Sequence, residues 1–164
     1  MKEEFEKFWE SNSPYSNWYM SPFEAEGITF NCSEQYYMYK KALFFNDQKN
    51  AELILEEKTP RRQKKLGKDV ANFNTELWDK HSFQIMYDVC KAKFTYDKEL
   101  LEAFLATKPK IFQECSPYDK KWGSGLLKTD PRSDDRNQWL GDNMLGEVLT
   151  KLRDDLLVEK LIIS

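Results

Sequence analysis

The sequence predicts a single α+β domain over residues 1–164, mainly helical with a few short strands. The first observation is apolar spacing: the stretch from Asn74 or Thr75 to Phe94 carries apolar residues on a broad face, which is typical of a long buried helix. The second is the presence of helix-capping residues at the borders of the other helical stretches. The third is composition, because 164 residues with 40% hydrophobic content suffice for one core and are too few for two.

Short strands are predicted near the N-terminus and in the second half of the chain. Residues 5–9 alternate enough to form a first strand, and residues 11–16 form a polar loop. Residues 22–25 and 28–30 should pair as a hairpin, with Gly27 supplying the turn. A further strand is expected at residues 110–115.

Six helices are predicted, with capping residues that set their ends. They cover residues 33–45, 50–58, 60–67, 75–94, 98–106 and 143–161. Ser33 is the expected N-cap of the first, and Asn46-Asp47 ends it. Thr59 should cap the third, which Gly67 should end as a left-handed residue, and Asp97 should cap the fifth.

A long loop is predicted over residues 116–143. Loops of this length without regular structure are uncommon in compact domains and are usually functional or disordered. Trp122 and Trp139 lie within it, which favours order. The chain shows no internal repeat and no linker.

Composition excludes several classes of protein. The formal net charge of -3 provides no general attraction to a polyanion, so any contact with nucleic acid must be local. The three cysteines, interpreted as buried reduced thiols, and the single His81, interpreted as an ordinary helix residue, exclude a Cys/His zinc site. No stretch approaches the ~20 apolar residues of a membrane span, and the N-terminus is acidic, so we expect a cytoplasmic protein without membrane contact.

Two charged residues of the first predicted helix form a candidate pair. Glu34 and Lys41 are seven positions apart, so they project from nearly the same helix face and can share one pocket. The alternative is that Glu34 only favours the helix N-terminus and that Lys41 is solvated.

Other candidates lie along the chain, each with a structural alternative. Asp119 sits near a glycine-flanked tryptophan in a loop whose N–H groups can meet an anion, or it forms an Asx turn. Trp18, Trp78 and Trp122 are stacking platforms for a base or core residues. Residues 58–68 contain six cations and no acid, which indicates a solvated face or, at Gly67-Lys68, a phosphate contact.

The ordered motifs of the chain resemble the NADAR (YbiA-like) family from about Ser16 to Arg153. The resemblance rests on Ser16-Asn17-Trp18, Ser33-Glu34-Gln35-Tyr36 with Lys41-Ala42, Leu66-Gly67-Lys68-x-Val70, Trp78, Lys93-Phe94, Ser116-Pro117-x-Asp119-x-x-Trp122-Gly123-x-Gly125-Leu126 and Asn143-x-Leu145-Gly146. It implies an N-glycosidase that cleaves the C1–N bond between a ribose phosphate and an exocyclic amine. Two substrate classes are implied: early ribosylamino-pyrimidines of riboflavin synthesis, and ADP-ribose on guanine in nucleic acid. The Trp-Gly-x-Gly-Leu form is more similar to the branch associated with ADP-ribose.

The resemblance and the chemistry of this bond together assign roles to the motif residues. Two carboxylates on different segments can supply the acid and the base, which are Glu34 and Asp119. Lys41 would stabilise the electrophile or trap the opened sugar as a Schiff base. The three tryptophans would shape the pocket beside Gly123, while hydroxyl or phosphate groups would be held by Asn17, Lys68 and Asn143. Lys68 stands where the family commonly has Arg, which keeps the charge and loses the bidentate grip.

This mechanism requires no metal or cofactor, and its partner is a small nucleotide or ADP-ribose adduct, which nucleic acid can carry. The first alternative is a binding module that sequesters ADP-ribose or a related nucleotide signal without turnover. The second is a pure interaction protein. The sequence determines neither the leaving group nor the oligomeric state.

Overall fold

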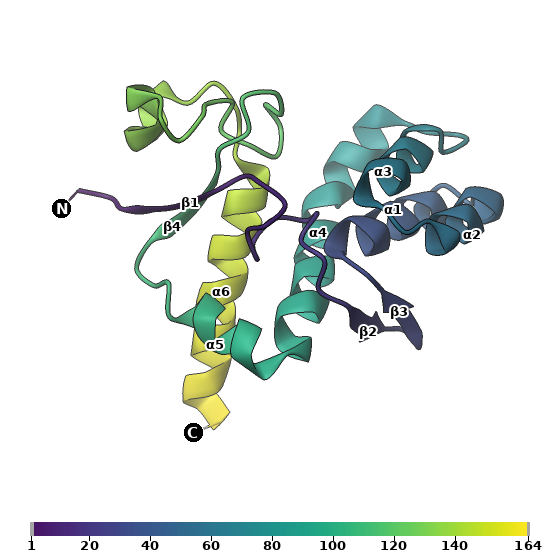
Figure 1. Cartoon of the computed structure of the whole chain (residues 1–164), viewed down its shortest axis with the longest axis horizontal. Coiled ribbons are helices and arrows are strands. Elements are labelled where there is room, and N and C mark those ends of the chain that lie inside the picture. Colours follow the sequence, from purple (N-terminus) through teal and green to yellow (C-terminus); the bar gives the residue numbers. More distant parts are fainter. Residues whose placement is uncertain (1, 164) are drawn as a thin grey trace. The chain divides into compact units, whose positions relative to one another are not determined.

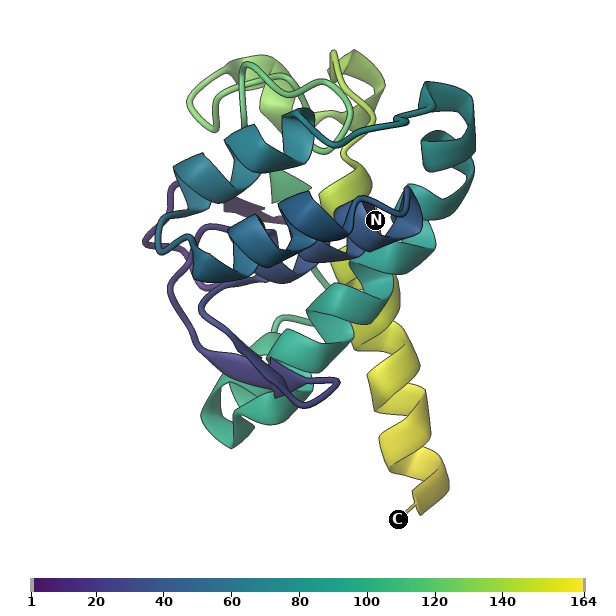
Figure 2. The same ribbon diagram turned by 90° about the vertical axis from the view of Figure 1, so that its right-hand side faces the viewer.

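The computed structural model describes residues 2–163 and divides into two compact units. We call Asn17–Asp97 the central unit and Met1–Ser16 together with Lys98–Ser164 the terminal unit. Figure 1 shows the elements of both, and Figure 2 shows the same ribbon turned by 90°. The predicted α+β class, mainly helical with short strands, is confirmed.

The central unit is a hairpin followed by four helices. Its elements are β2 (Phe23–Ala25), β3 (Ile28–Phe30), α1 (Ser33–Phe44), α2 (Gln48–Glu56), α3 (Pro60–Lys68) and α4 (Thr75–Tyr96). Helix α1 contacts α2, α3 and α4, while α2 contacts α3 and the hairpin strand β2 contacts α4. Helix α1 is therefore the element around which this unit packs (Figure 1).

The predicted hairpin is confirmed in its strands and its turn. Phe23 pairs with Phe30 across the antiparallel strands, and both side chains are buried. The turn residues Glu26 and Gly27 have φ of 54° and 75°. Two consecutive left-handed residues give the turn the twist that a two-residue hairpin loop favours.

Two buried glutamines tie α1, α2 and α3 together. The Gln35 side chain donates to the carbonyl oxygens of Ile54 at 3.1 Å and Glu57 at 3.1 Å, at the end of α2. The Gln63 side chain donates to the same Glu57 carbonyl at 2.9 Å and to Asn31 Oδ1 at 3.1 Å. These bonds satisfy backbone groups at a helix end that would otherwise be costly to bury.

The predicted starts of two helices in the first half of the unit were wrong. Cys32, not Ser33, is the N-cap of α1, and Ser33 is a buried residue of the helix itself. Helix α2 begins at Gln48 rather than Asn50, because the Asp47 side chain accepts the Asn50 N–H and is the N-cap. Both starts differ from the prediction by one or two residues, because residue type alone does not fix the first hydrogen-bonded turn of a helix.

The prediction for Gly67 was also wrong. Helix α3 continues through Gly67 to Lys68, and Thr59 is its N-cap as expected. A Cβ at position 67 would lie 1.9 Å from Met38 Sδ of α1. The glycine is therefore required by close packing between two helices and not by a left-handed turn.

The terminal unit combines two parallel strands with two helices. Its elements are β1 (Phe5–Phe8), α5 (Lys98–Leu105), β4 (Ile111–Glu114), the short 3₁₀ turns η1 (Pro131–Asp134) and η2 (Arg136–Gln138), and α6 (Met144–Ile163). Phe5 pairs with Ile111 at the start of the parallel ladder. Helix α6 packs on β4 and also contacts α5. The predicted strands at both positions are confirmed.

The long loop of this unit is ordered and includes the two 3₁₀ turns, which corrects the prediction of no regular structure. Trp139 donates from Nε1 to the Ser133 carbonyl at 3.0 Å, and its ring centroid lies 5.1 Å from that of Phe5. The prediction that tryptophan orders this loop is thus confirmed for Trp139.

Two smaller predictions, the buried reduced cysteines and His81 as an ordinary helix residue, were also correct. Cys32, Cys90 and Cys115 are free, buried thiols, and burial raises the pKa of the Cys90 thiol to about 12. His81 lies exposed on α4. Among residues 2–163, no helix combines the length and the apolar character needed to cross a membrane.

Candidate functional site

The predicted site residues fall in both units, and each group is described within its own unit. The central unit holds Asn17, Trp18, Glu34, Lys41, Lys68 and Trp78. The terminal unit holds Asp119, Trp122, Gly123 and Asn143.

Glu34 lies in the first turn of α1 and is buried, with 6% of its surface exposed. Its backbone N–H donates to the Asn17 carbonyl at 3.0 Å. The N–H groups of a first helical turn have no acceptor within the helix, so Asn17 satisfies one of them. The local positive end of the helix dipole favours the carboxylate at this position. The hydrogen bond thereby joins Asn17 to Glu34, which lie 17 positions apart in the sequence.

The segment from Asn17 to Tyr19 lies against helix α4. Asn17 Nδ2 lies 3.5 Å from Met86 Sδ, and the Tyr19 ring lies 5.7 Å from Lys93 Nζ. Asn17, Trp18 and Tyr19 are all half-buried. The predicted binding residues of this segment are thus held against a buried helix face rather than in a free loop.

Lys41 extends over aromatic rings near the C-terminal end of α1. Its Nζ lies 4.5 Å from the centroid of the Phe73 ring and 6.0 Å from that of Trp78. A cation at this distance from a ring face is attracted by the ring quadrupole. The half-buried Lys41 is therefore more than a solvated lysine, and its catalytic role stays a prediction.

Trp78 belongs to an aromatic cluster of the central unit. It is 5% exposed, and its ring centroid lies 5.6 Å from that of Tyr37 and 5.6 Å from that of Phe44. These contacts favour a core position for the indole. Its contribution to a substrate pocket remains a prediction.

Lys93 is a candidate that the sequence pattern alone did not single out. It is 1% exposed on α4, with its Nζ 4.9 Å from the Phe94 ring. Burial lowers the pKa of this lysine to about 8, opposed by the thiols of Cys90 and Cys32. Two signals pointed to it: the Lys93-Phe94 pair in the family pattern, and its spacing of seven from the buried Met86. A buried lysine with a perturbed pKa is a functional candidate.

The charges of Glu34 and Lys93 both influence the pKa of the Cys32 thiol. Its pKa is raised to about 11: burial is the largest cause and the Glu34 charge adds to it, while backbone hydrogen bonds from Gln35 and Glu34 and the Lys93 charge lower the pKa. The carboxyl and the buried amine thus act on one thiol at the start of α1.

The cations of α3 lie on the surface. Lys68 is exposed in the last turn of the helix, after the buried Gly67. Arg61, Lys64 and Lys65 are exposed as well. The assignment of Lys68 to a phosphate stays a prediction.

Asp119 forms the turn that its structural alternative described. Its Oδ1 accepts the N–H of Trp122 at 2.8 Å and the N–H of Lys121 at 3.0 Å. Trp122 is half-buried, and Lys121 Nζ lies 5.5 Å from its ring. A backbone role for Oδ1 does not preclude chemistry at the same carboxyl, so proton transfer by Asp119 stays a prediction.

Asn143 and Gly123 support the strand and loop around Asp119. The Asn143 side chain accepts the Glu114 N–H at 2.9 Å and donates to the Phe112 carbonyl at 2.9 Å. Both ends of this amide therefore serve β4, which favours a structural role over the predicted substrate contact. A Cβ at position 123 would lie 2.8 Å from the Asp119 carbonyl oxygen, so the loop requires glycine there.

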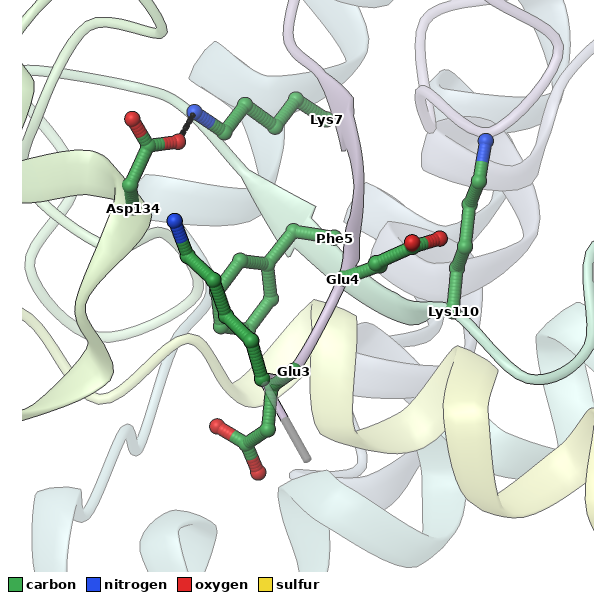
Figure 3. Close-up of a pocket in the computed structure, with 7 residues that line it drawn as sticks. Glu3, Glu4, Phe5, Lys7, Lys110 and Asp134 are labelled. Atoms are coloured by element: carbon green, nitrogen blue, oxygen red, sulfur yellow. Dashed lines mark hydrogen bonds and ion pairs between the residues drawn. The ribbon is translucent and has the colours of Figure 1, made fainter.

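A surface hollow of about 460 Å³ lies in the terminal unit and contains none of the predicted site residues. Its lining consists of Lys2, Glu3, Glu4, Phe5, Lys7, Lys110 and Asp134 (Figure 3). Lys7 and Asp134 form an ion pair of 2.6 Å there, and Lys110 pairs with Glu6 at 3.4 Å. Within residues 2–163, no group of three or more His, Cys, Asp or Glu side chains could hold a metal ion.

Comparison with known proteins defines the family. Residues 4–157 match the model of the NADAR domain. Protein irg-1 of Caenorhabditis elegans is 38% identical over 168 residues, which cover 93% of this chain and 79% of that protein. N-glycosidase R617 of Acanthamoeba polyphaga mimivirus is 36% identical over 146 residues, which cover 86% of each chain.

A solved structure agrees with this assignment. The NMR structure of the Escherichia coli protein YbiA matches with a TM-score of 0.79 at 29% identity, covering 98% of this chain and 89% of that one. The same bacterium's N-glycosidase YbiA is 30% identical over 146 residues, covering 89% of this chain and 82% of that protein. The chain belongs to the NADAR family. The relatives named N-glycosidase support a hydrolase of this general kind.

Proposed function

We propose that the chain is an N-glycosidase that cleaves the C1–N bond between a ribose phosphate, or an ADP-ribose, and an exocyclic amine. The observation that carries this proposal is Glu34, a carboxyl buried to 6% exposure in the first turn of α1 and held there through the Asn17 carbonyl. Its support is the family, which contains proteins named N-glycosidase.

The proposed chemistry needs an acid for the leaving amine and a base for water. Glu34 and Asp119 take these roles: one protonates the leaving nitrogen as the C1–N bond breaks, and the other removes a proton from the water that adds to C1. The balance is one water consumed, with its hydrogen on the amine and its hydroxyl on the sugar. The carboxyls supply every proton transfer, so we propose that the reaction needs no metal.

A lysine offers a second route to the same products. Its neutral amine would attack C1, the amine of the base would leave with a proton, the sugar ring would open to an imine, and water would release the sugar. Lys41 is the amine that the helix spacing favours. Lys93 is the amine that burial favours, because a pKa of about 8 leaves a larger neutral fraction than an ordinary lysine has.

The test of the function is a turnover assay with both substrate classes. The protein is incubated with a ribosylamino-pyrimidine phosphate and with an ADP-ribosylated guanosine, with and without EDTA, and mass spectrometry follows released ribose phosphate or ADP-ribose. We expect release of the sugar from at least one substrate, unaffected by EDTA. Tight binding without release would instead favour a module that sequesters ADP-ribose or a related nucleotide.

The test of the lysine route is borohydride trapping. Borohydride added during turnover reduces an imine to a stable secondary amine, so a sugar adduct on Lys41 or Lys93 would identify the nucleophile by peptide mass. Lys41→Arg and Lys93→Arg are the matched variants, because each keeps the positive charge and removes the reactive amine. If no adduct forms and both variants turn over, water attacks directly with the help of the two carboxyls.

A further inference from the structure

Helix α3 presents a row of cations on its exposed face. Arg61, Lys64, Lys65 and Lys68 are all exposed, whereas Gln63 and Gly67 on the opposite side are buried. At 100° per residue the four cations fall within about 100° of the helix circumference, and from first to last they span about 10 Å of axis. We call these four residues the α3 cationic stripe. Figure 2 shows α3 beside α2, with which it packs.

The stability of its own helix explains the stripe only in part: Lys65 and Lys68 in the last turn suit the negative end of the helix dipole, whereas Arg61 does not. The first turn of α3 contains no acid, and Arg61 lies there at the positive end of the helix dipole. The spacings 61–64, 61–65, 64–68 and 65–68 place like charges at i,i+3 and i,i+4, which is unfavourable. A helix selected only for stability would carry an acid in its first turn and alternate its charges.

The stripe is also not neutralised by neighbouring side chains. Within residues 2–163, no ion pair is recorded for any of its four members. The adjacent Arg62 approaches Glu57 at 4.0 Å, and the exposed Asp69 follows the last turn. Acids therefore border the helix ends and leave the stripe itself positive, in a protein whose formal net charge is -3.

We propose that the α3 cationic stripe binds the phosphate backbone of a polynucleotide that carries the substrate, an inference that rests on the proposed N-glycosidase function. A linear array of exposed cations matches the repeated charges of a strand, and backbone contacts of this kind position a protein without reading sequence. Association depends on local attraction, because the net charge of the whole protein repels a polyanion.

The experiment compares two triple variants of the full chain by fluorescence anisotropy with a short labelled DNA oligonucleotide, single-stranded and as a duplex. The stripe variant carries Arg61→Glu, Lys64→Glu and Lys65→Glu, and it retains Lys68. The control variant carries Lys49→Glu, Lys80→Glu and Lys91→Glu, three exposed lysines of the same unit, so both variants change the net charge equally.

We expect the stripe variant to lose ~10²-fold or more in affinity at low salt, and the slope of log K against log salt to fall by about 1 for each cation removed. The control should lose far less. Comparing the single strand with the duplex identifies which form binds. Binding of the stripe variant within twofold of the wild type, or an equal loss in the control, would overturn the proposal.

Two further readouts separate this proposal from unfolding and from failure of the proposed function. The thermal midpoint of the stripe variant should be unchanged or higher, because the substitutions place an acid in the first turn and give the 64–68 and 65–68 pairs opposite charges. If the thermal midpoint falls, the charge-reversing substitutions are replaced by the neutral ones Arg61→Gln, Lys64→Gln and Lys65→Gln. Turnover of an ADP-ribosylated mononucleoside should be unchanged in the stripe variant. If the wild type turns over neither this nucleoside nor the ribosylamino-pyrimidine phosphate, the N-glycosidase function is refuted, whereas the DNA-binding measurement still tests the stripe.

Discussion

The two units each bury one cation almost completely, and the surroundings of these cations differ. Lys93 of the central unit and Arg153 of the terminal unit are both 1% exposed. Arg153 donates to Asp154 Oδ1 at 3.0 Å, to Thr107 Oγ1 at 3.1 Å and to the Lys110 carbonyl. Lys93 lies beside the rings of Tyr19 and Phe94 and the thiols of Cys32 and Cys90, and its pKa falls to about 8.

The difference separates a structural cation from a functional candidate. The hydrogen bonds of Arg153 offset its desolvation and connect α6 to the chain leading into β4, and a guanidinium keeps its proton in proteins. The environment of Lys93 does not fully compensate its charge, so the amine can lose a proton near neutral pH. The charge of Lys93 is thus titratable just above neutral pH, whereas hydrogen bonds to Thr107 and the Lys110 carbonyl hold the charge of Arg153 in place.

The largest expected effect concerns the carboxyl of the central unit. Glu34→Gln keeps the shape of the side chain and removes proton transfer, so we expect turnover to fall by ~10²–10⁴-fold with substrate binding retained. Turnover and ligand affinity are measured on the same preparation. The control is Glu56→Gln, an exposed acid of α2, which should leave turnover unchanged. An unchanged rate for Glu34→Gln would remove this residue from the mechanism.

The second prediction addresses the structural cation. Arg153→Met keeps much of the side-chain volume and leaves Thr107 Oγ1 and the Lys110 carbonyl without this donor. We expect a loss of roughly 2–4 kcal/mol in the free energy of unfolding, measured by urea denaturation at pH 7. Lys93→Met is the matched comparison and should not lose stability at this pH. Equal losses for both variants would abolish the distinction between the two cations.

The third prediction is the pH dependence that Lys93 imposes. Its pKa is about 8 in the folded protein against an ordinary value of 10.5, so between these pH values the unfolded chain binds the extra proton. Unfolding therefore becomes harder as pH rises from 8 to 10.5, and the penalty of burying the charge is fully present below pH 8. The two pKa values differ by enough to contribute roughly 3 kcal/mol.

Lys93→Met isolates this contribution from those of the other titrating groups. Its stability advantage over the wild type should be largest near pH 7 and should diminish toward pH 10.5. Urea denaturation across this range measures the difference. An advantage that stays constant with pH would mean that the folded pKa of Lys93 is not lowered.

The smallest expected effect tests the turn at Asp119. Asp119→Asn keeps the Oδ1 acceptor for the Trp122 and Lys121 N–H groups, so stability should change by less than ~0.5 kcal/mol, whereas Asp119→Ala should lose about 1 kcal/mol. Thermal denaturation of both variants measures this. Turnover then separates the two roles of the carboxyl: a loss in Asp119→Asn reports proton transfer, and full activity would leave only the turn.

The sequence alone predicted the element order and most of the site candidates. The strands, the hairpin turn at Gly27 and the long helix from Thr75 follow from local alternation, φ preference and apolar spacing, which are properties of neighbouring residues. The placement of Glu34 in a first helical turn and the free thiols follow for the same reason. The family followed from ordered motifs along the chain, which the comparisons then confirmed.

Only the tertiary structure decided which polar groups are buried and what they contact. Gly67 looked like a helix end from its residue type, but contact with Met38 of another helix explains it. Asn143 was predicted to contact the substrate, and only the structure shows that its amide completes hydrogen bonds of β4. Lys93 was not singled out because its spacing shows only that it faces the core. Its lowered pKa arises from burial, which the neighbouring thiols oppose, and such desolvation depends on distant segments that no local pattern encodes.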